Sequence, residues 1–207
     1  TFSLFFIFIL KKKKTLINKK TSFFYGWLFG FGYFFTNLYW ISISLTFDVN
    51  FKFLIPITII LIPAFLAIFY GLAIFFLFIS NFKNTLSLFF LFALLLGLVE
   101  FLRGIILTGF PWNLIAFSFF NYIEILQIIS VIGTYAFNMF CISLFISPAI
   151  FILKRSSGYF VIFIFFLIIP IILYLNGSLK VKNFQNLDLI QNDYIIRAIS
   201  SNIKLER

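Results

Sequence analysis

Long apolar runs, separated by short groups of lysines, fill most of this 207-residue sequence. Hydrophobic residues make up 63% of the chain and charged residues only 11%. A helix needs about 20 predominantly apolar residues to cross the hydrocarbon core of a bilayer. Inside that core, a helix satisfies all of its own backbone hydrogen bonds. The sequence therefore predicts an all-α polytopic membrane helix bundle.

Six segments are expected to span the membrane. The first apolar run, residues 2–10, is too short for a complete crossing, so we expect a truncated first span and a chain that is a fragment of a longer protein. No positively charged segment precedes this run, which is therefore not typical of a signal peptide. The other five predicted spans are residues 21–45, 53–80, 86–103, 124–153 and 159–175.

Positive charge marks one side of the membrane. Three of the connections between predicted spans carry it, namely residues 11–20, Lys83 and residues 154–155. Alternation of the spans places all three connections on the same side. Because cytoplasmic loops are enriched in lysine and arginine, we expect this side to be cytoplasmic. Residues 104–121 and the tail after residue 176 are then expected outside the cytoplasm.

The net charge and the residue types exclude several classes of function. The net charge is +10, and its location beside the spans favours contact with anionic lipid over nucleic acid, so no nucleic-acid partner is expected. The sequence contains no histidine, which excludes a histidine-based metal site and a Ser-His-Asp triad within these residues. We predict neither a metal nor a cofactor. The one cysteine, Cys141, excludes an internal disulfide and lies in an apolar segment, where a thiol acts as a small hydrophobic group.

Residues 100–112 are the most unusual stretch, because they combine an acid, a base, two glycines, a proline and a tryptophan. Glu100 and Arg103 share one face of a helix and are expected to pair. An ionisable residue within a span costs roughly 2.5–3.5 kcal/mol on insertion scales and commonly marks function. We expect the helix to end near Gly104. Residues 108–113 should then form a non-helical turn at the interface.

The tail differs in character from the rest of the chain. Residues 176–193 are polar, and residues 194–202 are predicted to form a β-strand that runs into a turn. An isolated strand is not stable, so this strand is expected to begin a soluble domain. We therefore divide the chain into a transmembrane helical domain, residues 1–176, and the beginning of a second domain, residues 177–207.

Two blocks of sequence resemble a known family. Residues 100–112 read EFLRGIILTGFPW, and residues 26–34 read GWLFGFGYF, followed by NLYW at residues 37–40. The blocks, their order and their spacing are similar to those of apolipoprotein N-acyltransferase, the bacterial enzyme that completes lipoprotein maturation. The resemblance covers essentially the whole chain. It identifies the expected strand as the start of a truncated α/β nitrilase-like domain.

The resemblance implies a function and a location. Members of the family transfer an acyl chain from a membrane phospholipid to the N-terminal amine of the diacylglyceryl-cysteine of an apolipoprotein, through a thioester on the enzyme. The family's Glu-Lys-Cys triad lies downstream of these residues, so residues 1–207 alone are expected to be inactive and Cys141 is not the nucleophile. The expected setting is the bacterial inner membrane, as a multi-pass monomer with its C-terminal domain on the periplasmic side.

The candidate site in this chain is an entrance for the lipid substrates at the outer surface. Arg103 would either meet a lipid phosphate or, paired with Glu100, only fix the loop, and both interpretations stay open. The alternative function is a multi-span transporter or a structural membrane subunit, which broken helices would suit. The candidate site residues are Glu100, Arg103, Thr108, Gly109, Phe110, Pro111, Trp112, Tyr39 and Trp40.

Overall fold

The computed structural model describes residues 1–15, 18–106 and 109–186. Helices account for all of the regular structure in these three ranges. The predicted strand at residues 194–202 lies outside them, and the predicted division into two domains at residue 176 stays a prediction. The α-helices are α1 (Phe2–Lys14), α2 (Lys19–Leu38), α3 (Ile55–Ile79), α4 (Thr85–Ile105), α5 (Ile123–Leu126), α6 (Ile129–Ile132), α7 (Thr134–Leu153) and α8 (Ser157–Gln185).

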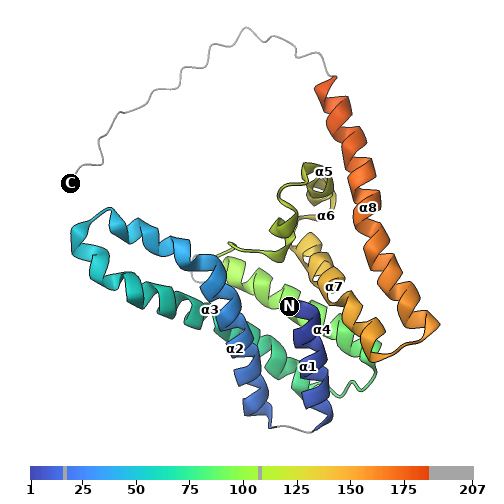
Figure 1. The fold of residues 1–207 in the computed structure, drawn as a ribbon, viewed down its shortest axis with the longest axis horizontal. Coiled ribbons are helices and arrows are strands. Elements are labelled where there is room, and N and C mark those ends of the chain that lie inside the picture. The colour runs from blue at the N-terminus through green and yellow to red at the C-terminus, as the bar shows by residue number, and fades with distance from the viewer. Residues whose placement is uncertain (16–17, 107–108, 187–207) are drawn as a thin grey trace.

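The long helices form a bundle with two helices at its centre. Figure 1 shows α1 and α4 between the α2–α3 pair on one side and α7 and α8 on the other. Helix α4 packs against both α3 and α7, and α1 packs against α7. The core is apolar and rich in phenylalanine, with Phe6, Phe34, Phe89 and Phe137 fully buried. This core holds the C-terminal half of α4, and with it the Glu100–Arg103 pair, inside the protein.

Four helical segments are long and apolar enough to span a membrane, which confirms four of the six predicted spans. They are Val49–Ile79, Thr85–Ile105, Thr134–Leu153 and Ser157–Gln185. The first and second predicted spans are also helical, but they do not meet that criterion. Helix α1 has only 13 residues. Helix α2 has 20 residues, and its apolar character is diluted by two lysines, three glycines and several hydroxyl or amide side chains.

Side chains at the helix starts explain where several elements begin. The side-chain oxygen of Asn84 accepts a hydrogen bond from Leu86 N at 3.1 Å and caps α4. Asn18 caps α2 in the same way, through Lys20 N. Short polar side chains at this position satisfy backbone N–H groups that have no partner within the helix. Pro56 lies in the first turn of α3, where a missing N–H costs nothing, and the helix continues through Pro63.

The predicted span at residues 21–45 is α-helical only as far as residue 38. The α-helix ends at Leu38, and the chain continues as a 3₁₀ helix, η1 (Tyr39–Thr46). The hydroxyl groups of Ser42, Ser44 and Thr46 each donate to the carbonyl three residues earlier, at 2.7 Å. These bonds follow the three-residue period of a 3₁₀ helix, and short polar side chains compete with regular α-helical bonding. The connection between the second and third predicted spans is also helical, because η2 (Val49–Leu54) forms there with Asp48 as its cap.

The predicted span at residues 124–153 is confirmed only from residue 134 onward, because it is not one continuous helix. Two single-turn helices, α5 and α6, precede α7, and the chain breaks at Gly133, whose φ is 81°. Backbone in this left-handed region is readily adopted by glycine and resisted by residues that carry a Cβ. A short 3₁₀ helix, η3 (Ile115–Phe119), lies just before α5. Only the part from Thr134 onward is therefore long enough to span.

The last predicted span is longer than the sequence suggested. Helix α8 runs from Ser157 to Gln185, ten residues beyond the expected end at Leu175. The polar residues that suggested an end are accommodated by the helix. Asn176 donates to Ile172 O at 3.0 Å and Ser178 donates to Tyr174 O at 2.8 Å. Their polar groups are satisfied along the helix, so the change in composition does not stop it.

Candidate lipid-facing loop

A buried ion pair lies at the C-terminal end of α4. Arg103 and Glu100 form the one ion pair found within the described residues, and only 2% and 1% of their surfaces are exposed. Tyr70, on α3, donates its hydroxyl to the second carboxylate oxygen of Glu100 at 2.8 Å. A buried charge is tolerated when it is paired and hydrogen-bonded. The predicted pairing of Glu100 with Arg103 is confirmed, and Tyr70 is a third member that sequence reasoning missed.

The same arginine holds the loop that follows α4. Its Nη1 atom donates to the carbonyl oxygens of Phe110, at 2.6 Å, and Trp112, at 2.9 Å. In the opposite direction, Phe110 N donates to Arg103 O at 2.9 Å. Three loop contacts therefore converge on one residue of the helix. Because the guanidinium is buried and engaged in this way, its geometry favours a role in fixing the loop over direct contact with a lipid phosphate.

The backbone of the loop requires two left-handed residues. Gly109 has a φ of 79°, and a Cβ at this position would overlap the carbonyl oxygen of Gly104. Asn113 has a φ of 62°, and its carbonyl accepts a hydrogen bond from the Tyr33 hydroxyl at 3.0 Å. Asparagine is one of the few residues with a Cβ that enters this region at modest cost. Residues 109–113 form no regular helix, as predicted, whereas Thr108 lies outside the described residues.

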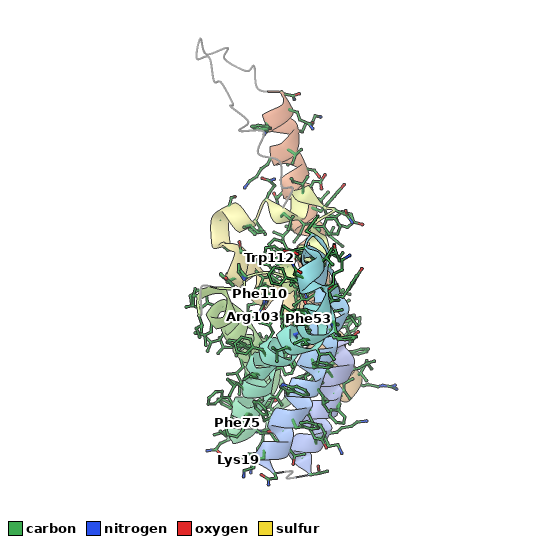
Figure 2. The ribbon with its side chains drawn as sticks, turned by 90° about the vertical axis from the view of Figure 1, so that its left-hand side faces the viewer. Lys19, Phe53, Phe75, Arg103, Phe110 and Trp112 are labelled. Carbon is green, nitrogen blue, oxygen red and sulfur yellow. The ribbon has the colours of Figure 1, made fainter. Side chains whose placement is uncertain are left out.

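Aromatic rings cover the loop and connect it to η1. The Trp112 ring stacks on Trp40 with centroids 5.1 Å apart and on Phe110 at 5.9 Å. About half of the Trp112 surface (51%) and 41% of Trp40 remain exposed. Tyr39, which directly precedes Trp40 in the sequence, is also exposed. Tryptophan rings with one exposed side are typical of the membrane–water interface. Figure 2 shows Phe110 and Trp112 close to Arg103, and Lys19 at the opposite end of the bundle.

A cleft opens next to the exposed tryptophan. It has a volume of about 580 Å³, and its lining is mainly apolar and aromatic. One wall comes from the loop and η3, and the other comes from the start of α7. The residues that line it are Pro111, Trp112, Asn113, Leu114, Phe117, Thr134 and Tyr135. Of the predicted site residues, Pro111 and Trp112 line this cleft, while Glu100 and Arg103 lie behind it in the core.

Asn138 is a supporting residue that sequence reasoning did not assign to the site. It is fully buried in α7, and its side-chain oxygen accepts a hydrogen bond from Ala116 N in η3 at 2.9 Å. This bond ties the far end of the loop segment to the bundle. Its sequence signal is a single amide inside an apolar span. Cys141 lies one turn further along α7 and is fully buried, in agreement with its predicted role as a hydrophobic group.

Comparison with protein families decides the relationship that the two sequence blocks suggested. The family described as the apolipoprotein N-acyltransferase N-terminal domain matches residues 1–145. The chain belongs to this family. The matched region runs from α1 into α7 and therefore contains the Glu100–Arg103 pair, the loop and the aromatic stack.

Curated relatives agree with this membership. The chain is 39% identical over 135 residues to apolipoprotein N-acyltransferase of Rhizobium etli, which is 64% of this chain and 25% of the relative. It is 38% identical over 129 residues to that of Brucella suis, covering 60% and 24% of the two chains. It is 38% identical over 128 residues to that of Rhodopseudomonas palustris, which is 61% of this chain and 24% of the relative. The chain spans about a quarter of the length of these curated relatives. No solved structure matches it significantly.

Proposed function

We propose that the protein containing this chain transfers an acyl chain from a membrane phospholipid to the N-terminal amine of the diacylglyceryl-cysteine of an apolipoprotein. The chain supplies the membrane domain, and residues 109–113, together with the exposed rings of Trp40 and Trp112, form the entrance through which the lipid substrates reach the catalytic domain. Family membership supports the reaction. The observation that carries the role of the loop is its attachment through Arg103, which leaves the Trp112 ring at the rim of an apolar cleft.

The proposed reaction has two steps. A cysteine thiolate in the domain downstream attacks the ester carbonyl of a phospholipid, forms a thioester and releases a lysophospholipid. The α-amine of the acceptor then attacks the thioester, an amide forms, and the thiol is regenerated. Covalent catalysis of this kind divides one difficult transfer into two easier ones. Cys141 takes no part, since it is buried in α7.

A firmly held loop suits substrates that are anchored in a bilayer. Both proposed substrates carry acyl chains, so their reacting groups stay near the level of the lipid headgroups. An entrance at that depth needs an apolar surface that keeps its shape, and the buried pair behind the loop supplies a rigid support. Prior positioning of reactants lowers the barrier to reaction, and a displacement of about 1 Å is enough to slow catalysis on the order of a hundredfold.

The topology forms part of the proposal. We place the protein in the bacterial inner membrane, with the loop after α4 and the C-terminal end of α8 on the periplasmic side. The lysine-rich connections, which include Lys11, Lys83 and Lys154, then lie in the cytoplasm. Alternation of the helices supports this arrangement, as does the enrichment of lysine in cytoplasmic loops.

The reaction is tested directly with the full-length protein. We expect vesicles of phosphatidylethanolamine that contain this protein to add a third acyl chain, by an amide bond, to a synthetic diacylglyceryl-cysteine peptide. One lysophospholipid should be released for each chain transferred. A peptide whose α-amine is acetylated serves as the control and should stay unmodified. If the free-amine peptide gains no acyl chain while the protein is folded in the vesicles, the proposed function is wrong.

A further inference from the structure

The end of the bundle opposite the loop contains a large cavity lined by lysines. Its volume is about 1050 Å³, just above the range of about 300–1,000 Å³ typical of small-molecule sites. Three regions far apart in the sequence contribute to it: the end of α1 with the start of α2, the α3–α4 connection, and the α7–α8 connection. The fold therefore gathers their positive charges in one place. The lysines that line the cavity are Lys11, Lys13, Lys14, Lys19, Lys83 and Lys154.

Lys13 differs from the other lysines of the cavity because it has a structural role. Lys13 donates from Nζ to the carbonyl oxygens of Leu77 and Ser80, at 2.7 and 2.8 Å, and so caps the C-terminal end of α3. A cation at the negative end of a helix dipole is stabilising. Within the described residues, the side chains of Lys14 and Lys83 form no comparable bond, and both residues are exposed.

Acidic side chains do not balance this charge among the residues that the structure describes. Those residues include three acids, Asp48, Glu100 and Glu124, and none of them lines the cavity. Glu100 is engaged with Arg103 in the core. The lysines therefore leave the cavity with an excess of positive charge.

The walls of the cavity are apolar, which restricts the kind of anion that suits it. Leu10, Leu88 and Leu153 lie among the lysines, and Ile79 and Phe82 leave 43% and 53% of their surfaces exposed. Such a wall gains nothing from a small hydrated anion. An amphipathic molecule, in contrast, would place its charged group against the lysines and its apolar part against the wall.

We propose that this cavity, at the lysine-rich end of the bundle, binds the phosphate headgroup of an anionic phospholipid from the adjacent membrane leaflet. This site lies at the opposite end from the loop after α4 and is separate from the proposed acyl-transfer substrates. The bound lipid would contact lysines from all three regions and so hold them together. Each lysine near an anionic headgroup strengthens its binding, so several lysines around one cavity make a selective site.

The test compares full-length proteins that differ in two lysines. Phosphatidylglycerol is titrated into the purified protein in detergent, and retained lipid is counted by native mass spectrometry. We expect the double variant Lys14→Gln, Lys83→Gln to bind phosphatidylglycerol about thirtyfold more weakly than the unchanged protein. The control variant Lys180→Gln, Lys182→Gln removes the same charge from α8, away from the cavity, and should bind normally. Lys13 is left in place because it caps α3.

Three further arms separate a lipid site from misfolding and from a site for soluble anions. The charge-preserving variant Lys14→Arg, Lys83→Arg should retain phosphatidylglycerol, which separates lost charge from lost folding. Phosphatidylcholine should be retained poorly, and millimolar inorganic phosphate should not displace phosphatidylglycerol. The proposal is overturned if the two lipids bind equally, if both Gln double variants bind alike, or if inorganic phosphate displaces the lipid, which would indicate a site for soluble anions.

Discussion

The two ends of the bundle handle charge in opposite ways. At the loop end, Arg103 and Glu100 are buried together and hydrogen-bonded to loop carbonyls and to Tyr70, and the exposed groups are aromatic rings. At the lysine-rich end, only Lys13 among the cavity lysines that the structure describes binds backbone carbonyls, while exposed lysines surround an open cavity. The first arrangement uses charge to fix a shape. The second leaves charge available for a ligand.

This contrast teaches that position, and not charge alone, determines what an ionisable residue does in a membrane bundle. A buried pair is sensitive to the loss of either partner, because the remaining charge is left in a medium of low dielectric constant. An exposed lysine keeps most of its hydration, so its removal changes binding more than stability. Substitutions at the two ends should therefore have different consequences.

The largest expected effect is a difference in thiol labelling, which shows on which side of the membrane each end of the bundle lies. In intact cells, a membrane-impermeant maleimide should label the full-length variant Asn183→Cys, at the end of α8, and should not label Ser156→Cys, just before its start. Both positions are exposed and Cys141 is buried. The unsubstituted full-length protein, which contains the proposed catalytic cysteine, is labelled in parallel, and its signal is subtracted. Breaking the cells should expose position 156. Labelling of position 156 but not 183 in intact cells would reverse the two ends and contradict the proposed topology.

The next largest effect is expected from Arg103→Ala in the full-length protein. This change leaves Glu100 buried without its partner and frees the carbonyls of Phe110 and Trp112. Loss of one partner of a buried pair costs about 3–5 kcal/mol, so folded protein in the membrane should fall sharply. Immunoblotting of membranes and thermal unfolding in detergent measure this loss.

Arg155 provides a matched control for this substitution. It is an exposed arginine near the lysine-rich end, and Arg155→Ala should leave abundance nearly unchanged. Removing both members of the buried pair, with Glu100→Leu and Arg103→Met, should recover part of the lost abundance, because no uncompensated charge remains. Equal abundance of Arg103→Ala and Arg155→Ala would show that the buried pair is unimportant for folding.

A smaller effect is expected from Gly30→Ala, in the contact between α2 and α3. A Cβ at Gly30 would lie 2.8 Å from Tyr70 Cβ and 3.1 Å from Ala67 Cα, so it would displace the tyrosine that binds Glu100. Overpacking of this kind costs about 1–3 kcal/mol and should lower the unfolding temperature. Gly32→Ala, two residues along the same helix, meets nothing within 4 Å and should not lower it. Similar unfolding temperatures for the two variants would argue against close packing there.

Much of the fold follows from hydropathy, because apolar runs of sufficient length have few alternatives to helices in a bilayer. Four of the six expected spans are confirmed as long apolar helices. The errors lie where single residues override composition. Gly133 breaks a continuous apolar run through its left-handed backbone, and the serines of η1 convert the end of a span to 3₁₀ geometry. Hydropathy averages do not register either effect.

Contacts of the candidate site between residues close in the sequence could be predicted. Contacts between residues far apart in the sequence could not. The Glu100–Arg103 pair follows from a separation of three residues on one helix. By contrast, the hydroxyl of Tyr70 reaches Glu100 from thirty residues away, and Trp40 reaches Trp112 from another connection. No periodicity encodes these contacts, because they depend on how α2, α3 and α4 pack.

The central claim is that the loop after α4 is a lipid-facing surface held in place from behind. The measurement that tests it most directly is thioester formation with phospholipid by full-length Trp112→Ala. This change removes an exposed ring and leaves every loop contact of Arg103 in place, because Arg103 binds the backbone carbonyl of residue 112. Phe76→Ala is the matched control, since Phe76 is 52% exposed and Trp112 is 51% exposed, and Phe76 lies in α3, away from the loop.

We expect Trp112→Ala to reach the membrane at the normal level and to form the thioester more slowly, on the order of tenfold, because the lipid is less well positioned. Phe76→Ala should form the thioester at the normal rate. If Trp112→Ala forms it as fast as the unchanged protein at equal protein level, the loop is only a structural turn and the claim of a lipid entrance is wrong.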